Sequence, residues 1–199
     1  GRVQSSMTLL ILGLMMGYLV SAAVSLLLYF AIPERIQAYI NWTFGSFGSV
    51  TWDQMPILAG GVIAGLLLAL VLTKSLNILL LGEGYARSLG VNITLTRVLI
   101  VGATALLAGI VTAFCGPIGF VGIAVPHLCR SLFNTSDHRL LVPATILMGA
   151  IVALVAAILA EVPGNNLVLP LNAVTALIGA PVVMMVILRQ RNVQKSFGE

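Results

Sequence analysis

The residues of this chain that could do chemistry are few. His127 and Cys129 stand one residue apart, and imidazole and thiolate are common ligands of metal ions. Further cysteine, histidine or carboxylate residues do not follow at ligand spacing, so we expect a histidine at a helix end, with neither a metal site nor a cofactor. A nucleophile with a neighbouring base is not evident, and the phosphate-binding sequence GxxxxGK followed by Ser or Thr does not occur. The sequence therefore predicts no enzyme activity for this chain.

An apolar run with helix breakers set into it is the most informative stretch. It reads GPIGFVGIAVPH over residues 116–127, with Gly116, Gly119 and Gly122 spaced by three and Pro117 near its start. Glycine and proline weaken or interrupt helices. Irregular backbone at membrane depth is tolerated only where protein or a water-filled cavity covers it. We therefore expect this run to line an interface or a path and not to face lipid.

The composition predicts that the helices around this run lie in a membrane. Of the 199 residues, 59% are hydrophobic and 8% are charged, and the mean hydropathy is +1.10, which excludes the charged surface of a soluble domain. A helix crosses the hydrocarbon layer with roughly 20 apolar residues. We expect an all-α polytopic membrane protein with six transmembrane helices, of which the fourth is short and partly broken, at residues 7–30, 55–73, 98–115, 117–133, 142–160 and 170–190.

The distribution of basic residues predicts the orientation. If residues 74–97 are cytoplasmic, six crossings place both ends of this chain in the cytoplasm. Nine of the ten basic residues then lie inside, and Arg35 lies outside with Glu34, Asp53 and Glu161. The positive-inside rule expects this excess of basic residues in the cytoplasm. The basic residues are not clustered among aromatic ones, so we do not expect nucleic-acid binding.

Two linkers have predictable character. Residues 31–54 are rich in aromatic side chains and predict a short amphipathic helix at the outer interface. Residues 74–97 predict one or two short helices that end at Gly82 and Gly90. Such a compact insert could fit a cleft of another protein or could simply pack on the helices, and the residues alone leave both interpretations open.

Four motifs, in order along the chain, carry a family resemblance. They are LGE to LGV over residues 81–91, GPIGFVG leading to Pro126 and His127, SDHR over 136–139, and VTALIGAP over 174–181. Together they resemble the FecCD family, the permeases of binding-protein-dependent, ATP-driven importers for iron-siderophores, haem and cobalamin. The resemblance runs from about Met7 to Arg191. Members typically have ten helices, so residues 1–199 are expected to form one permease domain that corresponds to the last six helices and is incomplete at its N-terminus.

The resemblance implies partners and a mechanism. The insert at 74–97 is similar to the family's coupling helices, which fit a groove of the ATPase subunit, and the matching residues are Gly82, Glu83, Ala86, Arg87, Leu89 and Gly90. The implied assembly lies in the bacterial inner membrane. It contains a pair of permeases, identical or different, two cytoplasmic ATP-binding-cassette subunits that hydrolyse ATP, and a periplasmic or lipid-anchored substrate-binding protein. Substrate would pass by alternating access.

The resemblance also implies which residues border the path. The helix at 7–30 is similar to the one that lines it, which assigns Met15 and Gly17 there, and the glycine-rich run adds Gly116, Pro117, Gly119 and Gly122. The small-residue pairs Gly13 with Gly17 and Gly61 with Gly65 are typical of close helix packing.

One departure from the family pattern affects the outer surface. Many relatives carry Asp, Arg and Glu where this chain has Ala157, Glu161 and Val168, and their Arg meets an acidic residue of the binding protein. The opposite charge of Glu161 predicts docking on a basic partner surface, or contacts elsewhere.

Two other transport classes are the alternatives. A secondary transporter or a channel could also be a glycine-rich bundle, but ion-coupled carriers usually hold ionisable residues inside the membrane, and the five long apolar stretches have none. Siderophore, haem and cobalamin permeases share the motifs above. An iron chelate is the first expectation for the substrate because that class is the commonest in the family.

Overall fold

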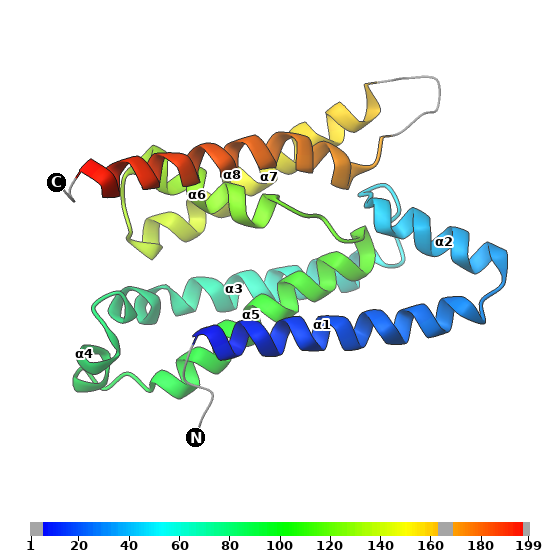
Figure 1. The fold of residues 1–199 in the computed structure, drawn as a ribbon. Helices are drawn as coiled ribbons and strands as arrows, with labels where there is room; N and C mark the ends of the chain where they lie inside the picture. The colour runs from blue at the N-terminus through cyan, green and yellow to red at the C-terminus, as the bar shows by residue number, and fades with distance from the viewer. Residues whose placement is uncertain (1–5, 163–168, 197–199) are drawn as a thin grey trace. The chain divides into compact units, whose positions relative to one another are not determined.

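The computed structural model describes residues 6–162 and 169–196, and every regular element in that part of the chain is an α-helix (Figure 1). The helices within the described ranges are α1 (Ser6–Tyr29), α2 (Pro33–Phe44), α3 (Met55–Leu79), α4 (Glu83–Ser88), α5 (Ile93–Cys115), α6 (Val121–Phe133), α7 (His138–Glu161) and α8 (Leu171–Ser196). The prediction of an all-α protein is confirmed.

Four of the helices described are long enough and apolar enough to cross a membrane. They are α1, over Leu10–Tyr29, and the whole of α3, α5 and α7. Helix α6 has 13 residues and is about 20 Å long, which is less than the roughly 30 Å of the hydrocarbon layer. The apolar part of α8, Leu171–Pro181, is shorter still. The count of six spans therefore stays a prediction.

Helices α3 and α5 extend into the predicted insert at residues 74–97. Helix α3 does not end at residue 73 but continues to Leu79, and α5 begins at Ile93. Residues 80–92 lie outside these two helices and contain α4. The insert was predicted from its charged residues, which mark the edge of the hydrocarbon layer, and a helix can continue beyond that edge into the polar interface.

Helices α5 and α7 also begin before the predicted residues 98 and 142, each at a capping residue. The side chain of Asn92 accepts a hydrogen bond from the amide of Leu95 at 3.1 Å. The carboxylate of Asp137 accepts one from the amide of Arg139 at 2.8 Å. A side-chain acceptor at the N-cap satisfies one of the free amides of the first turn, which explains both starts.

The predicted fourth span, residues 117–133, is helical only from Val121. The backbone before it is irregular, with positive φ angles of 80° at Gly116 and 65° at Phe120. Irregular backbone was predicted over residues 116–127. The second half of this run, including Pro126, instead lies inside α6.

The chain forms two compact units, Gly1–Asn41 and Trp42–Glu199. The first contains α1 and most of α2. Helix α2 is the amphipathic helix predicted within residues 31–54, because Ile36 and Tyr39 are half-buried while Glu34 and Gln37 are exposed. Helix α1 is largely apolar, and most of its described large side chains are exposed.

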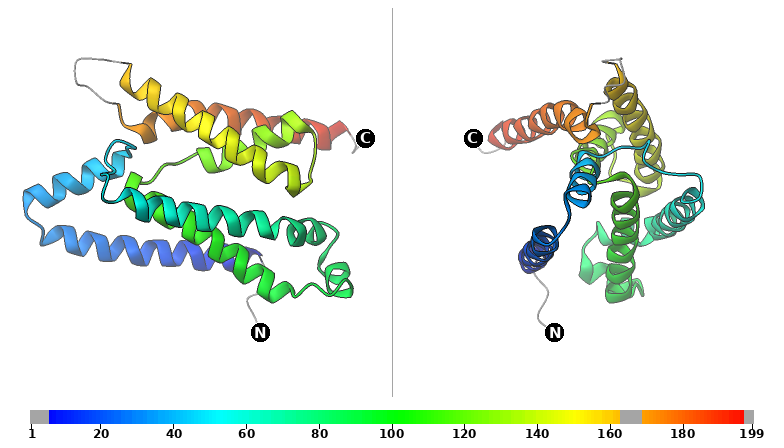
Figure 2. Two further views of the ribbon diagram at one scale, coloured as in Figure 1. Left: turned by 180° about the vertical axis from the view of Figure 1, so that it is seen from behind. Right: turned by 90° about the vertical axis from the view of Figure 1, so that its right-hand side faces the viewer.

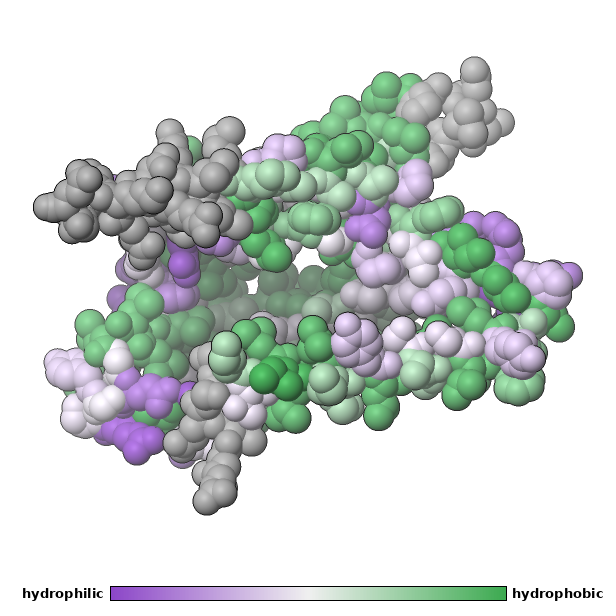
Figure 3. All heavy atoms as spheres, in the orientation of Figure 1, coloured by the Kyte–Doolittle hydropathy of each residue, from purple (hydrophilic) through white to green (hydrophobic). Residues whose placement is uncertain are grey.

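The second unit is a bundle in which α3 runs beside α5, and α6 packs on α7 and α8 (Figure 2). Its buried core is small. One cluster holds Val125, Cys129 and Leu141 between α6 and α7, and another holds Ala156, Ala160, Leu171 and Val174 between α7 and α8. Most large apolar side chains instead point outward, and green residues cover much of α7 and alternate with pale and lilac ones along α1 in the space-filling view (Figure 3). Such a surface fits lipid and not water.

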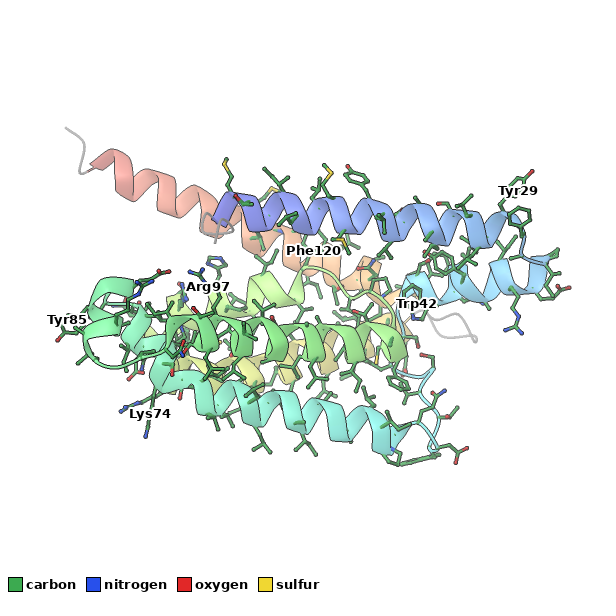
Figure 4. The ribbon with its side chains drawn as sticks, turned by 90° about the horizontal axis from the view of Figure 1, so that it is seen from below. Tyr29, Trp42, Lys74, Tyr85, Arg97 and Phe120 are labelled. Carbon is green, nitrogen blue, oxygen red and sulfur yellow. The ribbon has the colours of Figure 1, made fainter. Side chains whose placement is uncertain are left out.

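The bundle has two distinct ends, which Figure 4 separates along α3 and α5. Lys74, Tyr85 and Arg97 lie at one end, here the α4 end, and Trp42 lies at the other, the Trp42 end. At the Trp42 end, the amide of Ser46 donates to the carbonyl of Cys115 at 2.9 Å. The start of α8 also lies there, since the amide of Leu171 donates to the carbonyl of Gly45 at 3.4 Å.

Candidate functional site

Helix α4 forms a short, anchored projection at one end of the bundle. Gly82 precedes it with φ 99° and Gly90 follows it with φ 80°, a conformation that favours glycine, so the predicted glycine ends are confirmed. The side chain of Ala86 is fully buried, and its carbonyl accepts the amide of Val91 at 3.0 Å. This closes the loop on itself and gives α4 a defined position.

The outer surface of this segment is apolar and exposed. More than half of each large side chain is accessible, and these residues are Leu80, Leu81, Tyr85 and Leu89. At the edge of this surface, Glu83 Oε1 and Arg97 Nη2 lie 2.6 Å apart and tie α4 to α5. A rigid, mostly apolar projection with one ion pair can fit a groove of another protein.

The structure divides the predicted coupling residues into two kinds. Glu83, Arg87 and Leu89 are exposed and could touch a partner. Ala86 is buried, where its side chain anchors the helix, and its coupling role stays a prediction. Leu80 and Leu81, which the sequence prediction did not include, are exposed beside α4. Two adjacent exposed leucines at the end of a long apolar helix look, in sequence, like more of that helix.

The charges of the bundle are divided between its ends. All five basic residues between Trp42 and Val162 belong to the α4 end, and they are Lys74, Arg87, Arg97, Arg130 and Arg139. Asp53 and Glu161 lie at the Trp42 end, next to the start of α3 and at the last residue of α7. The two ends of the bundle thus differ in the sign of their net charge.

A polar network joins α3 to α7 near α4. The Asn77 side-chain amide donates from Nδ2 to Asp137 Oδ1, and its Oδ1 accepts from the backbone amide of His138 at 2.8 Å. The ring nitrogen Nδ1 of His138 lies 2.9 Å from the same oxygen. Hydrogen bonds from the Arg139 amide and from Asn77 lower the pKa of Asp137 below its ordinary value. Asn77 and Asp137 are 60 residues apart, so no local sequence signal could have paired them.

The glycine-rich run makes a packed junction at the Trp42 end. The indole Nε1 of Trp42 donates to the carbonyl of Thr112 at 3.1 Å, and Gly116 is buried where a Cβ atom would overlap the Trp42 carbonyl. The amide of Gly119 donates to Asn172 Oδ1 of α8 at 3.1 Å. Protein therefore covers Gly116 and Gly119, as the sequence predicted for irregular backbone.

Gly122 is separated from this junction. It lies within α6 and borders a hollow of about 290 Å³ together with Ile123, Pro126, His127 and Arg130. A larger hollow of about 580 Å³ is lined mainly by apolar side chains of α3, α5 and α7, with Thr145 and Thr175 as polar contributors. The predicted path residues on α6 and before it thus lie in two different settings.

His127 and Cys129 do not face the same space. His127 borders the hollow beside Arg130, whereas Cys129 is fully buried against Val125 and Leu141. Within the ranges the structure describes, groups of three or more His, Cys, Asp or Glu side chains that could hold a metal ion do not occur.

The remaining predicted site residues lie elsewhere. Met15 and Gly17 are on α1, in the first unit, and both residues are exposed. Glu161 is exposed at the end of α7, Ala157 is one turn before it, and Val168 lies outside the described residues. Their roles stay predictions.

Comparison with known proteins gives one family. The model of the FecCD transport family matches residues 1–189. Among curated proteins, the vitamin B12 import system permease protein BtuC of Klebsiella pneumoniae is 37% identical over 190 residues, which cover 96% of this chain and 57% of that protein. BtuC of Citrobacter koseri is 36% identical over 190 residues, with the same coverage. The chain thus spans little more than half the length of these relatives.

A solved structure is also similar. It is described as an inward-facing conformation of a metal-chelate type ABC transporter, and it matches with a TM-score of 0.85 and 32% identity. The match covers 94% of this chain and 60% of that one. The chain therefore has the fold of part of that transporter chain.

Proposed function

The chain belongs to the FecCD transport family, and from this we propose that it is part of the membrane permease of an ATP-driven importer. The substrate class is an iron-siderophore, haem or cobalamin, carried by alternating access between outward-open and inward-open states. The observation that carries the proposal is the family match over nearly the whole chain, together with a rigid apolar projection at its basic end.

We place the α4 end in the cytoplasm and the Trp42 end outside. The five basic residues of the α4 end support this orientation through the positive-inside rule. The same geometry supports crossings by α6 and α8. Cys115 lies at the Trp42 end and Asp137 at the α4 end, so residues 116–136, although only partly helical, run from one end to the other.

We assign residues 80–92 as the surface that a cytoplasmic ATPase grips. The exposed Leu81, Tyr85 and Leu89 would enter its groove, and the glycine-bounded geometry would make α4 move as a unit. Glu83 and Arg97 would border the contact. The chain itself would perform no chemistry, and ATP would be hydrolysed by the partner.

The translocation path and the outer docking surface follow from the same orientation. Met15 and Gly17 of α1 and Gly122 beside the hollow on α6 are assigned to the path, while Gly116, Pro117 and Gly119 shape its outer end. The exposed Glu161 is assigned to contact with a basic surface of a substrate-binding protein. Its replacement, E161K, should weaken that contact, and an unchanged dissociation constant would remove Glu161 from the docking surface.

The test of function is uptake by the permease reconstituted with its ATPase and binding protein. The probes are radiolabelled vitamin B12, a ferric hydroxamate siderophore and haem, each supplied with ATP, without ATP, and with an ATPase variant that lacks its phosphate-binding lysine. We expect uptake of one probe that requires ATP and the intact ATPase. Uptake driven by an ion gradient alone would indicate a secondary transporter, and passive uptake would indicate a channel.

A further inference from the structure

We infer that Asn77, Asp137 and His138 form a clasp that makes α3 and α7 move as one body when α4 is displaced. The inference rests on the proposed function, because it concerns how a movement imposed on α4 reaches the helices behind it. The three residues act on positions and not on substrate, so they are positioning residues.

The clasp has one consistent arrangement of hydrogen bonds. A carboxylate can only accept, so the Asn77 nitrogen must face Asp137, and a backbone amide can only donate, so the Asn77 oxygen must face His138. That oxygen also lies 2.9 Å from His138 Nδ1, which therefore carries a proton. The amide is held from both sides, and turning it over would break every one of these bonds.

The clasp lies between α4 and the rest of the bundle. Asn77 lies in the last turn of α3, and α4 begins six residues later at Glu83. Asp137 caps α7, and Leu141, one turn further on, is buried against Val125 and Cys129 of α6. A displacement of α4 that pulls on the end of α3 would thus pass through the clasp to α7 and on to the helix that follows the glycine-rich run.

The directionality of these hydrogen bonds, more than their free energy, makes the clasp suited to transmitting a movement from α3 to α7. Asp137 is exposed to solvent, and a hydrogen bond there contributes only about 1 kcal/mol to stability. Hydrogen bonds nevertheless fix the position of one helix end relative to the other, whereas apolar contacts alone would let the two ends slide. The alternative is that Asp137 serves only as the cap of α7.

The test exchanges the two side chains. In N77D two carboxylates face each other, while Asp137 still caps Arg139. In the exchanged variant, N77D with D137N, the carboxylate now at position 77 would accept from His138 and from the amide nitrogen now at position 137. Asp137 uses one oxygen, Oδ1, for both Asn77 and the Arg139 amide, so the new amide group must turn to offer its oxygen to Arg139 and its nitrogen to position 77. In that orientation asparagine is as good a helix cap as aspartate, and the start of α7 is preserved. Repulsion should therefore open the clasp in N77D, and the exchange should close it again.

Spin labels on exposed positions report the result. They replace Lys74 on α3 and Leu154 on α7 of the full permease in lipid nanodiscs, and the distance distribution is measured without nucleotide and, with the ATPase bound, with ATP and vanadate. We expect one narrow peak, unchanged by nucleotide, in the unmodified and exchanged proteins. We expect loss of that peak in N77D.

Each outcome bears on one of the two proposals. A narrow, unchanged peak in N77D would overturn the clasp, and so would a broad peak that the exchange does not narrow. Failure of the permease to bind any ATPase would overturn the proposed function, but the measurement without nucleotide would still decide the clasp.

Discussion

At the scale of single residues, Gly116 lies where an added side chain would overlap the backbone of another segment. Its φ of 80° and ψ of 174° lie in a region almost limited to glycine, where other residues are strained by about 1–3 kcal/mol, and an added Cβ would overlap the Trp42 carbonyl. Gly82 lies in the same region, with φ 99° and ψ 152°, but has open space around it. We predict that G116A lowers the free energy of unfolding by about 1–3 kcal/mol more than G82A, because only G116A adds overpacking to the backbone strain.

Thermal unfolding of the two variants in detergent would measure this difference. G82A is the matched control for the conformational part of the effect. Equal losses would mean that the junction between Trp42 and Gly116 relaxes without cost, and that its packing is not tight.

The glycines at the two ends of α4 are the residues whose structural positions the sequence predicted best. The ends of α4 at Gly82 and Gly90 follow from the need for positive φ, a property of the residue itself. Partners far along the chain could not be predicted this way. The bonds of Asn77 to Asp137 and of Trp42 to Thr112 each join segments at least 60 residues apart, and only the packed fold brings them together.

At the scale of helices, the contact between α3 and α5 depends on a small residue. A Cβ on Gly65 would overlap Leu107 of α5, whereas a Cβ on Gly60, also in α3, meets nothing within 4 Å. Alanine is favoured over glycine within a helix by about 0.5–1 kcal/mol. We predict that G60A is neutral or stabilising, while G65A destabilises by about 1–3 kcal/mol through overpacking. Unfolding in detergent would compare them, and similar effects of both would contradict a close approach at Gly65.

Helix α4 gives a prediction about coupling that does not involve stability. Leu89 is 54% exposed, so L89D should leave the unfolding temperature unchanged. A carboxylate placed in an apolar groove is costly to desolvate, and we expect uptake per ATP hydrolysed to fall about tenfold or more. The control is L132D. Leu132, in the last turn of α6, is 67% exposed but lies outside the projection. Equal coupling in the two variants would argue that α4 does not enter the ATPase.

The extent of each helix shows why sequence predicts elements better than their ends. The apolar stretches located α1, α3, α5 and α7, since length and hydropathy are properties of the segment alone. The ends were wrong by several residues wherever a helix continues past the membrane, as α3 does to Leu79. Residues 116–127 were expected to be irregular, but only 116–120 are, because α6 begins at Val121. The partner of this segment on α8, Asn172, could not have been identified without the fold.

At the scale of the whole molecule, orientation is the prediction on which the others depend. Helix α3 has 25 residues, about 37 Å, so its two ends lie on opposite sides of a hydrocarbon layer of roughly 30 Å. The positive-inside rule then puts Tyr85 in the cytoplasm and Asp53 outside. We predict that a cysteine at position 53 reacts with a membrane-impermeant maleimide in intact spheroplasts, and that a cysteine at position 85 reacts only after permeabilisation. Cys115 and Cys129 are buried and give a low background. Reaction of position 85 from outside would invert the bundle and remove α4 from the reach of any cytoplasmic ATPase.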